Sequence, residues 1–243
     1  MPGRARQTLV LVTCEHGGNR IPGPYRRWFQ GRERILRSHR GYDPGALAMA
    51  RALGRNLRAP LIAATVSRLL VELNRSPRHR NLFSVVMRDA PAPIREELVE
   101  RYYLPYRSAV GRHVERAIAS GSRVVHVSSH SFTPVLRGVR RNAHVGLLYD
   151  PSRSFERELC TLWRNAMLAR APAWRVRRNY PYQGTSDGLT TWLRRRFQGA
   201  QYAGVELELN QALVRRNAAG FAYARRVVPA ALREAVELLG GVA

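Results

Sequence analysis

The sequence has no lysine, and only 17 acidic residues stand against 41 basic residues, all of which are arginine. The resulting formal net charge is +24 at pH 7. Such a complete replacement of lysine by arginine is typical of a genome-wide composition bias. The alternative is a surface for nucleic acid, because arginines neutralise phosphates. The arginine clusters are spread along the chain and no aromatic-interleaved RNA-binding motif accompanies them, so we expect no specific nucleic acid and only weak polyanion binding.

Cysteines and long apolar runs are also scarce. Cys14 and Cys160 lie far apart and form no CxxC pair, which argues against a disulfide framework or a structural zinc knuckle. No segment approaches the length of a membrane span, and the N-terminal MPGRARQ contains no apolar signal region. These features predict a cytoplasmic protein without a membrane partner. No linker or internal repeat marks a boundary, so residues 1–243 are expected to form a single domain.

What the sequence does contain is an alternation of strand-like and helix-like segments. Short runs rich in Val, Leu and Thr predict strands at 7–14, 61–66, 68–73, 123–129, 143–150 and 203–210. Apolar residues at helical spacing predict helices at 44–57, 94–119, 152–170 and 221–240, with Pro105 as a candidate break in the second. Strands that alternate with helices predict an α/β sheet covered on both faces.

Two histidines stand where apolar strands end. His16 follows TLVLVTCE and precedes two glycines, and His130 closes SRVVHVSS. Ligands of open α/β sheets bind outside the carboxyl ends of the strands. Two imidazoles delivered to that edge indicate a metal site or an acid–base site.

Three further residues complete a candidate constellation: Asp43, Arg75 and Glu208. A zinc hydrolase needs about three His, Asp or Glu ligands, and it needs a carboxylate beside the attacking water. The spacing is not the compact HExxH pattern, so other interpretations stay open. Asp43 could cap the following helix, Glu208 could lie on a solvated strand face, and Arg75 could be a surface arginine. Nucleophilic catalysis is disfavoured, because no GxSxG elbow is present: the GTSDG sequence at 184–188 lies in a polar loop with Pro and Gly, not between a strand and a helix. Ser131 beside His130 is not evidence of a triad.

Six blocks of the sequence, in order over nearly the whole chain, resemble the N-formylglutamate amidohydrolase family. The blocks are CEHGGNRIP, SHRGYDPGALAMARALG, VSRLLVELNRSP, SSHSFTPVLRG followed by HVGLLYD, RNYPYQG and VELELNQAL. Any single block alone would be weak evidence of the resemblance. Together they are specific for the family, although not for its substrate.

The resemblance implies a fold similar to the zinc carboxypeptidases and aspartoacylase-type deacylases. That fold is a three-layer α/β sandwich, with a mixed, mostly parallel central sheet flanked by helices and one zinc at the strand ends. By the same resemblance His16 and His130 are zinc ligands, and Asp43 is the third ligand ahead of Glu15 or Asn19. Glu208 is then the general base, and Arg75 clamps the substrate carboxylate or the scissile carbonyl.

The resemblance also assigns supporting roles. Glu15 and His144 are expected to orient the metal ligands. Residues expected to bind substrate are Asn19, Arg68, Asn74, Arg75, Ser131, Asn179 and Tyr182. Two positions depart from the family pattern: Glu72 stands where an Asp is expected before Asn74, and Gln211 stands where a basic residue is usual.

These observations predict a zinc-dependent amidohydrolase that cleaves the amide C–N bond of an N-acyl amino acid. The type reaction converts N-formyl-L-glutamate and water to formate and L-glutamate, with one Zn²⁺ per chain and a small-molecule substrate. Two alternatives remain. One is a catalytically inactive polyanion-binding protein on a hydrolase-like scaffold, and the other is a zinc peptidase or deacylase with a different substrate. The oligomeric state is left open.

Overall fold

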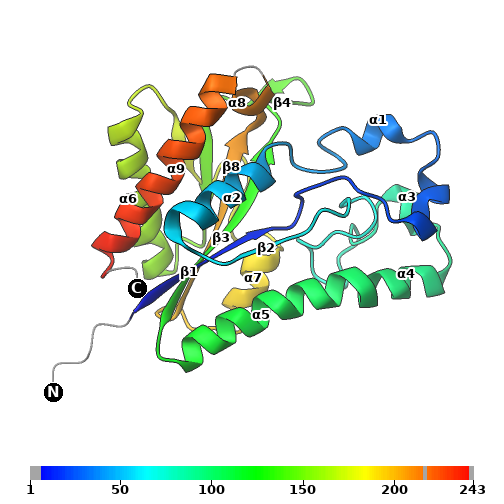
Figure 1. The fold of residues 1–243 in the computed structure, drawn as a ribbon, viewed down its shortest axis with the longest axis horizontal. Coiled ribbons are helices and arrows are strands. Elements are labelled where there is room, and N and C mark those ends of the chain that lie inside the picture. Colours follow the sequence, from blue (N-terminus) through cyan, green and yellow to red (C-terminus); the bar gives the residue numbers. More distant parts are fainter. Residues whose placement is uncertain (1–6, 216–217, 241–243) are drawn as a thin grey trace.

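The computed structural model describes residues 7–215 and 218–240, and a six-stranded sheet forms its centre (Figure 1). The strands of this sheet are β1 (Thr8–Cys14), β2 (Leu61–Ala63), β3 (Arg123–Phe132), β6 (Val145–Leu148), β7 (Val176–Arg178) and β8 (Tyr202–Asn210). A separate two-stranded hairpin joins β4 (Val135–Leu136) to β5 (Val139–Arg140).

The sheet is mixed and mostly parallel, as predicted. Its strand order is β2-β1-β3-β8-β6-β7. All neighbouring strands run parallel except β6 and β8, which pair antiparallel. The carboxyl ends of β1, β3 and β8 therefore meet at one edge, which is where ligands of such sheets bind.

Helices cover both faces of the sheet. On one face lie α2 (Ala46–Leu57), α6 (Ser154–Arg170) and α9 (Ala218–Leu238), packed on one buried apolar cluster. On the other face a second cluster lies under α5 (Leu104–Ala119) and α7 (Leu189–Arg194). This cluster extends past the end of the sheet to the 3₁₀ helix η1 (Gly23–Phe29), α3 (Val85–Arg88) and α4 (Ala92–Leu98) (Figure 1). Short α1 (Glu33–Leu36) and α8 (Gln211–Arg215) complete the helices. The structure is thus an α/β sandwich of three layers.

The alternation of strand side chains decides which residues reach the site. Val125 and Val127 of β3 point into the first apolar cluster, whereas His126, Ser128 and His130 point to the opposite face. His130 lies at the far end of this polar row, next to the carboxyl end of β1. The strand thus places His130 at the edge of the sheet, while Val125 and Val127 fill the first apolar cluster.

The sequence prediction was wrong at residues 68–73. This segment was expected to be a strand, but it consists of turns and irregular backbone. Its apolar side chains Leu69, Leu70, Val71 and Leu73 are buried in the second cluster without pairing with the sheet. Burial among helices satisfies an apolar run as well as strand pairing does, and periodicity alone does not separate the two. The strand predicted at 61–66 is shorter, since β2 ends at Ala63.

The long helix predicted at 94–119 is interrupted in the structure close to the expected place. Between α4 and α5 lies the π-helical turn η2 (Val99–Tyr103), directly before Pro105 in the first turn of α5. Proline has no backbone N–H to donate, so a change in the hydrogen-bond pattern is expected there.

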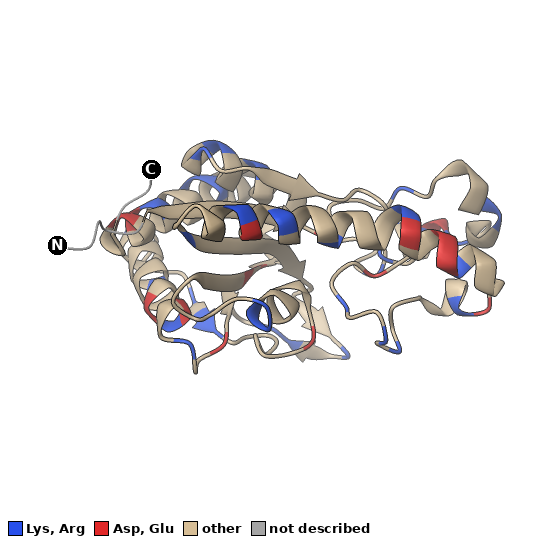
Figure 2. Ribbon diagram, turned by 90° about the horizontal axis from the view of Figure 1, so that it is seen from below, with Lys and Arg blue, Asp and Glu red and all other residues tan. Residues whose placement is uncertain are grey.

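No helix in the described part of the chain is long and apolar enough to cross a membrane. Figure 2 shows arginines on helices and loops over the whole ribbon, with far fewer acidic residues among them. In both views α3 and α4 lie at one end of the molecule, beyond the end of the sheet.

Candidate functional site

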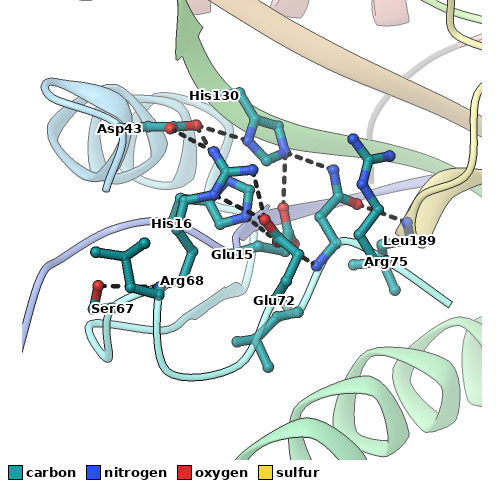
Figure 3. Close-up of polar contacts among 12 residues, drawn as sticks. Glu15, His16, Asp43, Ser67, Arg68, Glu72, Arg75, His130 and Leu189 are labelled. Atoms are coloured by element: carbon teal, nitrogen blue, oxygen red, sulfur yellow. Dashed lines mark hydrogen bonds and ion pairs between the residues drawn. The ribbon is translucent and has the colours of Figure 1, made fainter. Parts of the chain in front are cut away.

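His16, Asp43 and His130 meet at the carboxyl edge of the sheet. His16 follows β1, Asp43 precedes α2 and His130 lies near the end of β3. The backbone N–H of Asp43 donates to the carbonyl of His16 at 2.9 Å, which fixes the two loops together. Oδ2 of Asp43 lies 3.2 Å from Nδ1 of His16 and 3.0 Å from Nδ1 of His130 (Figure 3). All three side chains are buried.

These atoms have the spacing of a metal site. Tetrahedral zinc holds His and Asp ligands at about 2.0–2.2 Å, which separates the ligand atoms from one another by about 3.3 Å. The atoms from His16, Asp43 and His130 all lie within 4.8 Å of one another. Hydrogen bonds from the histidines to Asp43 would have similar lengths. The contacts of the other ring nitrogen, Nε2, therefore help to distinguish a metal site from a cluster held by hydrogen bonds alone.

Each imidazole contacts a second carboxylate through its Nε2. His16 Nε2 contacts Glu72, and His130 Nε2 lies 3.0 Å from Oε2 of Glu15 (Figure 3). In a neutral imidazole, an Nε2–H donated to a carboxylate leaves the lone pair on Nδ1, which points towards Asp43. Carboxylate–histidine pairs of this kind orient the histidines of zinc sites and raise their basicity. The donor set therefore fits a divalent metal.

Glu15 is held by a network at the base of the site. Its Oε1 accepts from the hydroxyl of Tyr106 at 2.8 Å, and its Oε2 accepts from Ser128 at 2.5 Å. Burial opposes ionisation, but the hydrogen bonds from His130 and Ser128 outweigh it and hold the pKa of Glu15 well below its usual value. Glu15 is therefore an anion. Its contact with the Nε2 side of His130 places it on the far side of that ring from Asp43.

Glu72, which the sequence marked only as a departure from the family pattern, belongs to the buried cluster. Arg68 donates from Nε to Oε2 of Glu72 at 2.8 Å and from Nη1 to Oδ1 of Asp43 at 3.2 Å. Burial would raise the pKa of Glu72, but the charge of Arg68 and the neighbouring His16 hold it well below the usual value. Arg68, predicted to bind substrate, thus spans two carboxylates of the site. The signal for Glu72 was its place two residues before Asn74.

The site attracts positive charge. Burial lowers the pKa of His130, but its hydrogen bonds with Asp43 and Glu15 and the charges of both carboxylates raise it well above the usual value. Asp43 stays ionised, because the neighbouring His16 and the bonds from both histidines outweigh its burial and hold its pKa low. The same negative charges that favour a proton on His130 would stabilise a divalent cation bound between these groups.

Glu208 lies opposite His130 in the register of β3 and β8. It is buried, and its Oε2 has no hydrogen-bond partner among the described residues. Burial raises the pKa of Glu208 to about 8, and the charges of Asp43 and Glu206 act in the same direction. A buried, unpartnered carboxyl oxygen is costly to a fold, which points to a functional use.

Gly146 makes room beside Glu208. It pairs with Glu208 across the antiparallel β6 and β8. A Cβ at this position would lie 1.9 Å from the backbone oxygen of Tyr180 and 3.2 Å from the Cβ of Glu208. Only glycine therefore allows the Tyr180 backbone to pass over the strand here.

Asn74 and Arg75 join the candidate metal cluster to the segment that precedes α7. Asn74 Nδ2 lies 3.5 Å from Nε2 of His130, and its Oδ1 accepts from the backbone N–H of Leu189 at 2.7 Å. The guanidinium of Arg75 donates to the backbone carbonyl of Asp187, and Oδ2 of Asp187 accepts from the N–H of Ser76 at 2.9 Å. Asp187 thus ties the segment 184–188 to residues 75–76.

The end of η2 and the first turn of α5 hold residues 73–75 in place. The Tyr103 hydroxyl donates to the carbonyl of Arg75 at 2.7 Å, and Arg107 donates to the carbonyls of Leu73 and Arg75 at 3.2 Å each. The Arg107 guanidinium also stacks 4.6 Å from the ring centroid of Trp192. The irregular segment is thus held by hydrogen bonds that a sheet would otherwise supply.

Four of the predicted residues make their hydrogen bonds away from the three candidate ligands. Asn19 donates to the carbonyl of Leu36 at 3.0 Å. Asn179 accepts from the N–H groups of Tyr149 and Gly184 at 3.0 and 3.2 Å. Tyr182 is exposed and accepts from Arg141 at 3.0 Å. His144 accepts from the N–H of Arg175 at 2.9 Å and stacks on Trp174.

Ser131 lies at the rim of the cluster. Its backbone N–H is 3.5 Å from Oδ2 of Asp43, and its hydroxyl donates to the carbonyl of Pro44 at 2.7 Å. Gln211, the second departure from the family pattern, donates to that hydroxyl at 3.2 Å. These contacts hold the loop that carries Asp43 against the end of β3.

Known proteins share this fold. The family model for N-formylglutamate amidohydrolase matches residues 8–215. The gene product Atu2144 from Agrobacterium tumefaciens is similar with a TM-score of 0.80 and 30% identity, over 96% of this chain and 92% of that chain. An N-formylglutamate amidohydrolase from Ralstonia eutropha JMP134 shares the fold with a TM-score of 0.68 and 21% identity, over 98% of this chain and 96% of that one. The chain matches no curated protein.

The fold and these matches define a hydrolase of the amidohydrolase type. The chain belongs to the N-formylglutamate amidohydrolase family.

Proposed function

We propose that this protein is a zinc-dependent amidohydrolase acting on N-acyl amino acids, with N-formyl-L-glutamate as the type substrate. Water adds to the formyl carbon, the C–N bond breaks, and formate and L-glutamate leave. One observation carries the proposal: two buried imidazoles turn Nδ1 towards Asp43 and Nε2 towards carboxylates, beside the unpartnered carboxyl of Glu208.

His16, Asp43 and His130 would hold the zinc. Bound there, zinc would lower the pKa of a water molecule and polarise the scissile carbonyl. Glu15 and Glu72 keep the two imidazoles in the required orientation through their Nε2 contacts.

Glu208 would act as the proton carrier. Its buried position raises the pKa of its carboxyl group to about 8, so the ionised form is a stronger base than a solvated glutamate. It would take a proton at Oε2 from the attacking water and give it to the leaving nitrogen. The lack of a protein partner at Oε2 leaves that atom available for both steps.

Arg75 would bind the substrate carboxylate or the developing oxyanion. Its guanidinium is half-buried, and its donation to the Asp187 carbonyl engages Nη1 alone. A guanidinium carries further N–H donors in a fixed planar fork, which matches a carboxylate.

The test is formate release from N-formyl-L-glutamate by the purified protein. The zinc-loaded protein should hydrolyse this substrate or another N-acyl amino acid, a chelator should abolish the activity, and added zinc should restore it. Hydrolysis that a chelator does not affect, or no hydrolysis of any N-acyl amino acid by zinc-loaded protein, would contradict the proposal.

A further inference from the structure

A small hollow adjoins the candidate metal cluster on the side of Arg68 and Glu72. Its volume is about 200 Å³, and its lining includes Arg40, Arg68, Glu72, Phe83 and Arg88. Arg68 and Glu72 are the residues that contact Asp43 and His16. A group bound in this hollow would therefore lie one residue away from the metal ligands.

A larger hollow of about 650 Å³ adjoins the small one. The two share the lining residues Asn81, Phe83 and Arg88. The larger hollow also presents the side chains of Arg78, His79, Arg80 and Arg95. A volume of this size is typical of sites for ligands larger than a single formylated amino acid.

The larger hollow is richer in arginine than the chain as a whole. Four of its nine lining residues are arginine and none is acidic, whereas arginine makes up 41 of the 243 residues of the chain. Within residues 7–215 and 218–240, no ion pair engages Arg40, Arg78, Arg80 or Arg88. The half-buried ring of Phe83 and the buried Leu82 add apolar surface between these charges.

We propose that the two hollows form an extended subsite for the carboxylates of an N-acylated acidic peptide. The inference rests on the proposed function, because it places the scissile amide at the candidate metal cluster. The first acidic residue would lie near Arg40 and Arg88, and the following residues would run outward to Arg78, Arg80 and Arg95. Peptide residues advance by about 3.3–3.6 Å each, so a few of them reach from one hollow into the next.

Binding of a product-like peptide tests the subsite without any catalysis. The probe is unformylated triglutamate, measured by titration calorimetry at about 0.15 M salt, where long-range attraction is largely screened. We expect the paired variant Arg80→Gln/Arg88→Gln to bind triglutamate at least tenfold more weakly than the parent. Triglutamine should bind to neither protein.

A matched control separates the subsite from the overall charge. Arg225 and Arg226 are exposed on α9, which packs on the other face of the sheet, and Arg225→Gln/Arg226→Gln removes the same number of positive charges. This variant should bind triglutamate as the parent does. Equal weakening by both variants, or no binding by the parent, would overturn the subsite.

Kinetics separate the subsite from the proposed function. The parent should show a higher kcat/KM for formyl-triglutamate than for N-formyl-L-glutamate, and the Arg80→Gln/Arg88→Gln pair should lose that preference. Triglutamate binding that depends on Arg80 and Arg88, without hydrolysis of either formylated compound, would support the binding surface and contradict the proposed reaction. Hydrolysis with equal kcat/KM values for the two substrates in the parent would contradict the subsite alone.

Discussion

Oδ2 of Asp43 lies 3.0 Å from Nδ1 of His130, although 87 residues separate the two in the chain. The sequence left open whether Asp43 caps the helix that follows it. In the structure the N-cap position of α2 is Gly45, and no side chain makes a capping hydrogen bond there. The carboxylate oxygens of Asp43 instead contact both histidines and Arg68. Asp43 therefore belongs to the buried cluster and not to the helix end.

The carboxylates behind the histidines should set the affinity for zinc. Glu15→Gln and Glu72→Gln each remove the charge that orients one imidazole, so each should weaken zinc binding by about 10–100-fold. Competition with a chromophoric chelator measures this affinity. Glu33→Gln, on the exposed α1, is the matched control and should leave the affinity unchanged. Unchanged affinity in both Glu15 and Glu72 variants would mean that the rings need no such orientation.

Glu208→Gln should separate proton transfer from metal binding. The amide has the shape of the carboxyl group but cannot accept the proton, so turnover should fall by about 10²–10⁴-fold. The zinc content should stay at the parent value, because Glu208 is not among the three candidate ligands. Stopped formate-release assays and metal analysis on the same sample give both numbers. Turnover equal to that of the parent would remove Glu208 from the mechanism.

The central strands were predictable because their apolar runs are bounded by turn residues. Both histidines were placed at strand ends from this pattern, and the structure has them there. The segment 68–73 was not predictable, because a buried apolar run has the same appearance whether a strand or an irregular segment carries it. Its last carbonyl, that of Leu73, is held by Arg107 from a helix 34 residues later, a contact that the sequence pattern does not reveal.

The pairings inside the site also lay beyond the sequence. Which carboxylate faces which nitrogen of a histidine depends on side-chain positions that come from four separate segments. Glu72 reaches His16 only because residues 68–73 turn back towards the sheet. The strand register that sets Glu208 against His130 is likewise a tertiary property. Residue types at strand ends indicated the site, but not its internal contacts.

Gly146 offers a test of packing at the site. Gly146→Ala would place a methyl group against the Tyr180 carbonyl, and overpacking of this kind should lower the free energy of unfolding by about 1–3 kcal/mol. The matched control is Gly23→Ala, where an added Cβ meets nothing within 4 Å, so its effect should stay within about 0.5 kcal/mol. Urea denaturation of both variants measures the difference. Equal stability of the two would show that the Tyr180 segment moves aside freely.

His126 should make the fold sensitive to acid. Its ring is buried between the hydroxyls of Thr13 and Tyr202, at 2.8 and 2.7 Å, and burial lowers its pKa to about 4. Between pH 6.5 and 4 the unfolded chain therefore binds a proton that the folded chain does not, so stability falls as the pH falls. The full effect of this group is about 3 kcal/mol below pH 4.

The check is the pH dependence of the unfolding free energy, compared between the parent and His126→Gln. The variant lacks the titrating group, so its stability should fall less steeply from pH 7 to 4.5. The slopes are compared rather than the stabilities, because the substitution also changes the hydrogen bonds to Thr13 and Tyr202. Identical slopes would show that His126 does not contribute to acid sensitivity.

The most direct test of the metal centre is the zinc content of the purified protein, measured by mass spectrometry beside a His16→Ala/His130→Ala variant. We expect about one zinc per chain in the parent and none in the variant, with both proteins folded by circular dichroism. No zinc in the parent after reconstitution, or equal zinc in a folded variant, would contradict a centre built on these two histidines.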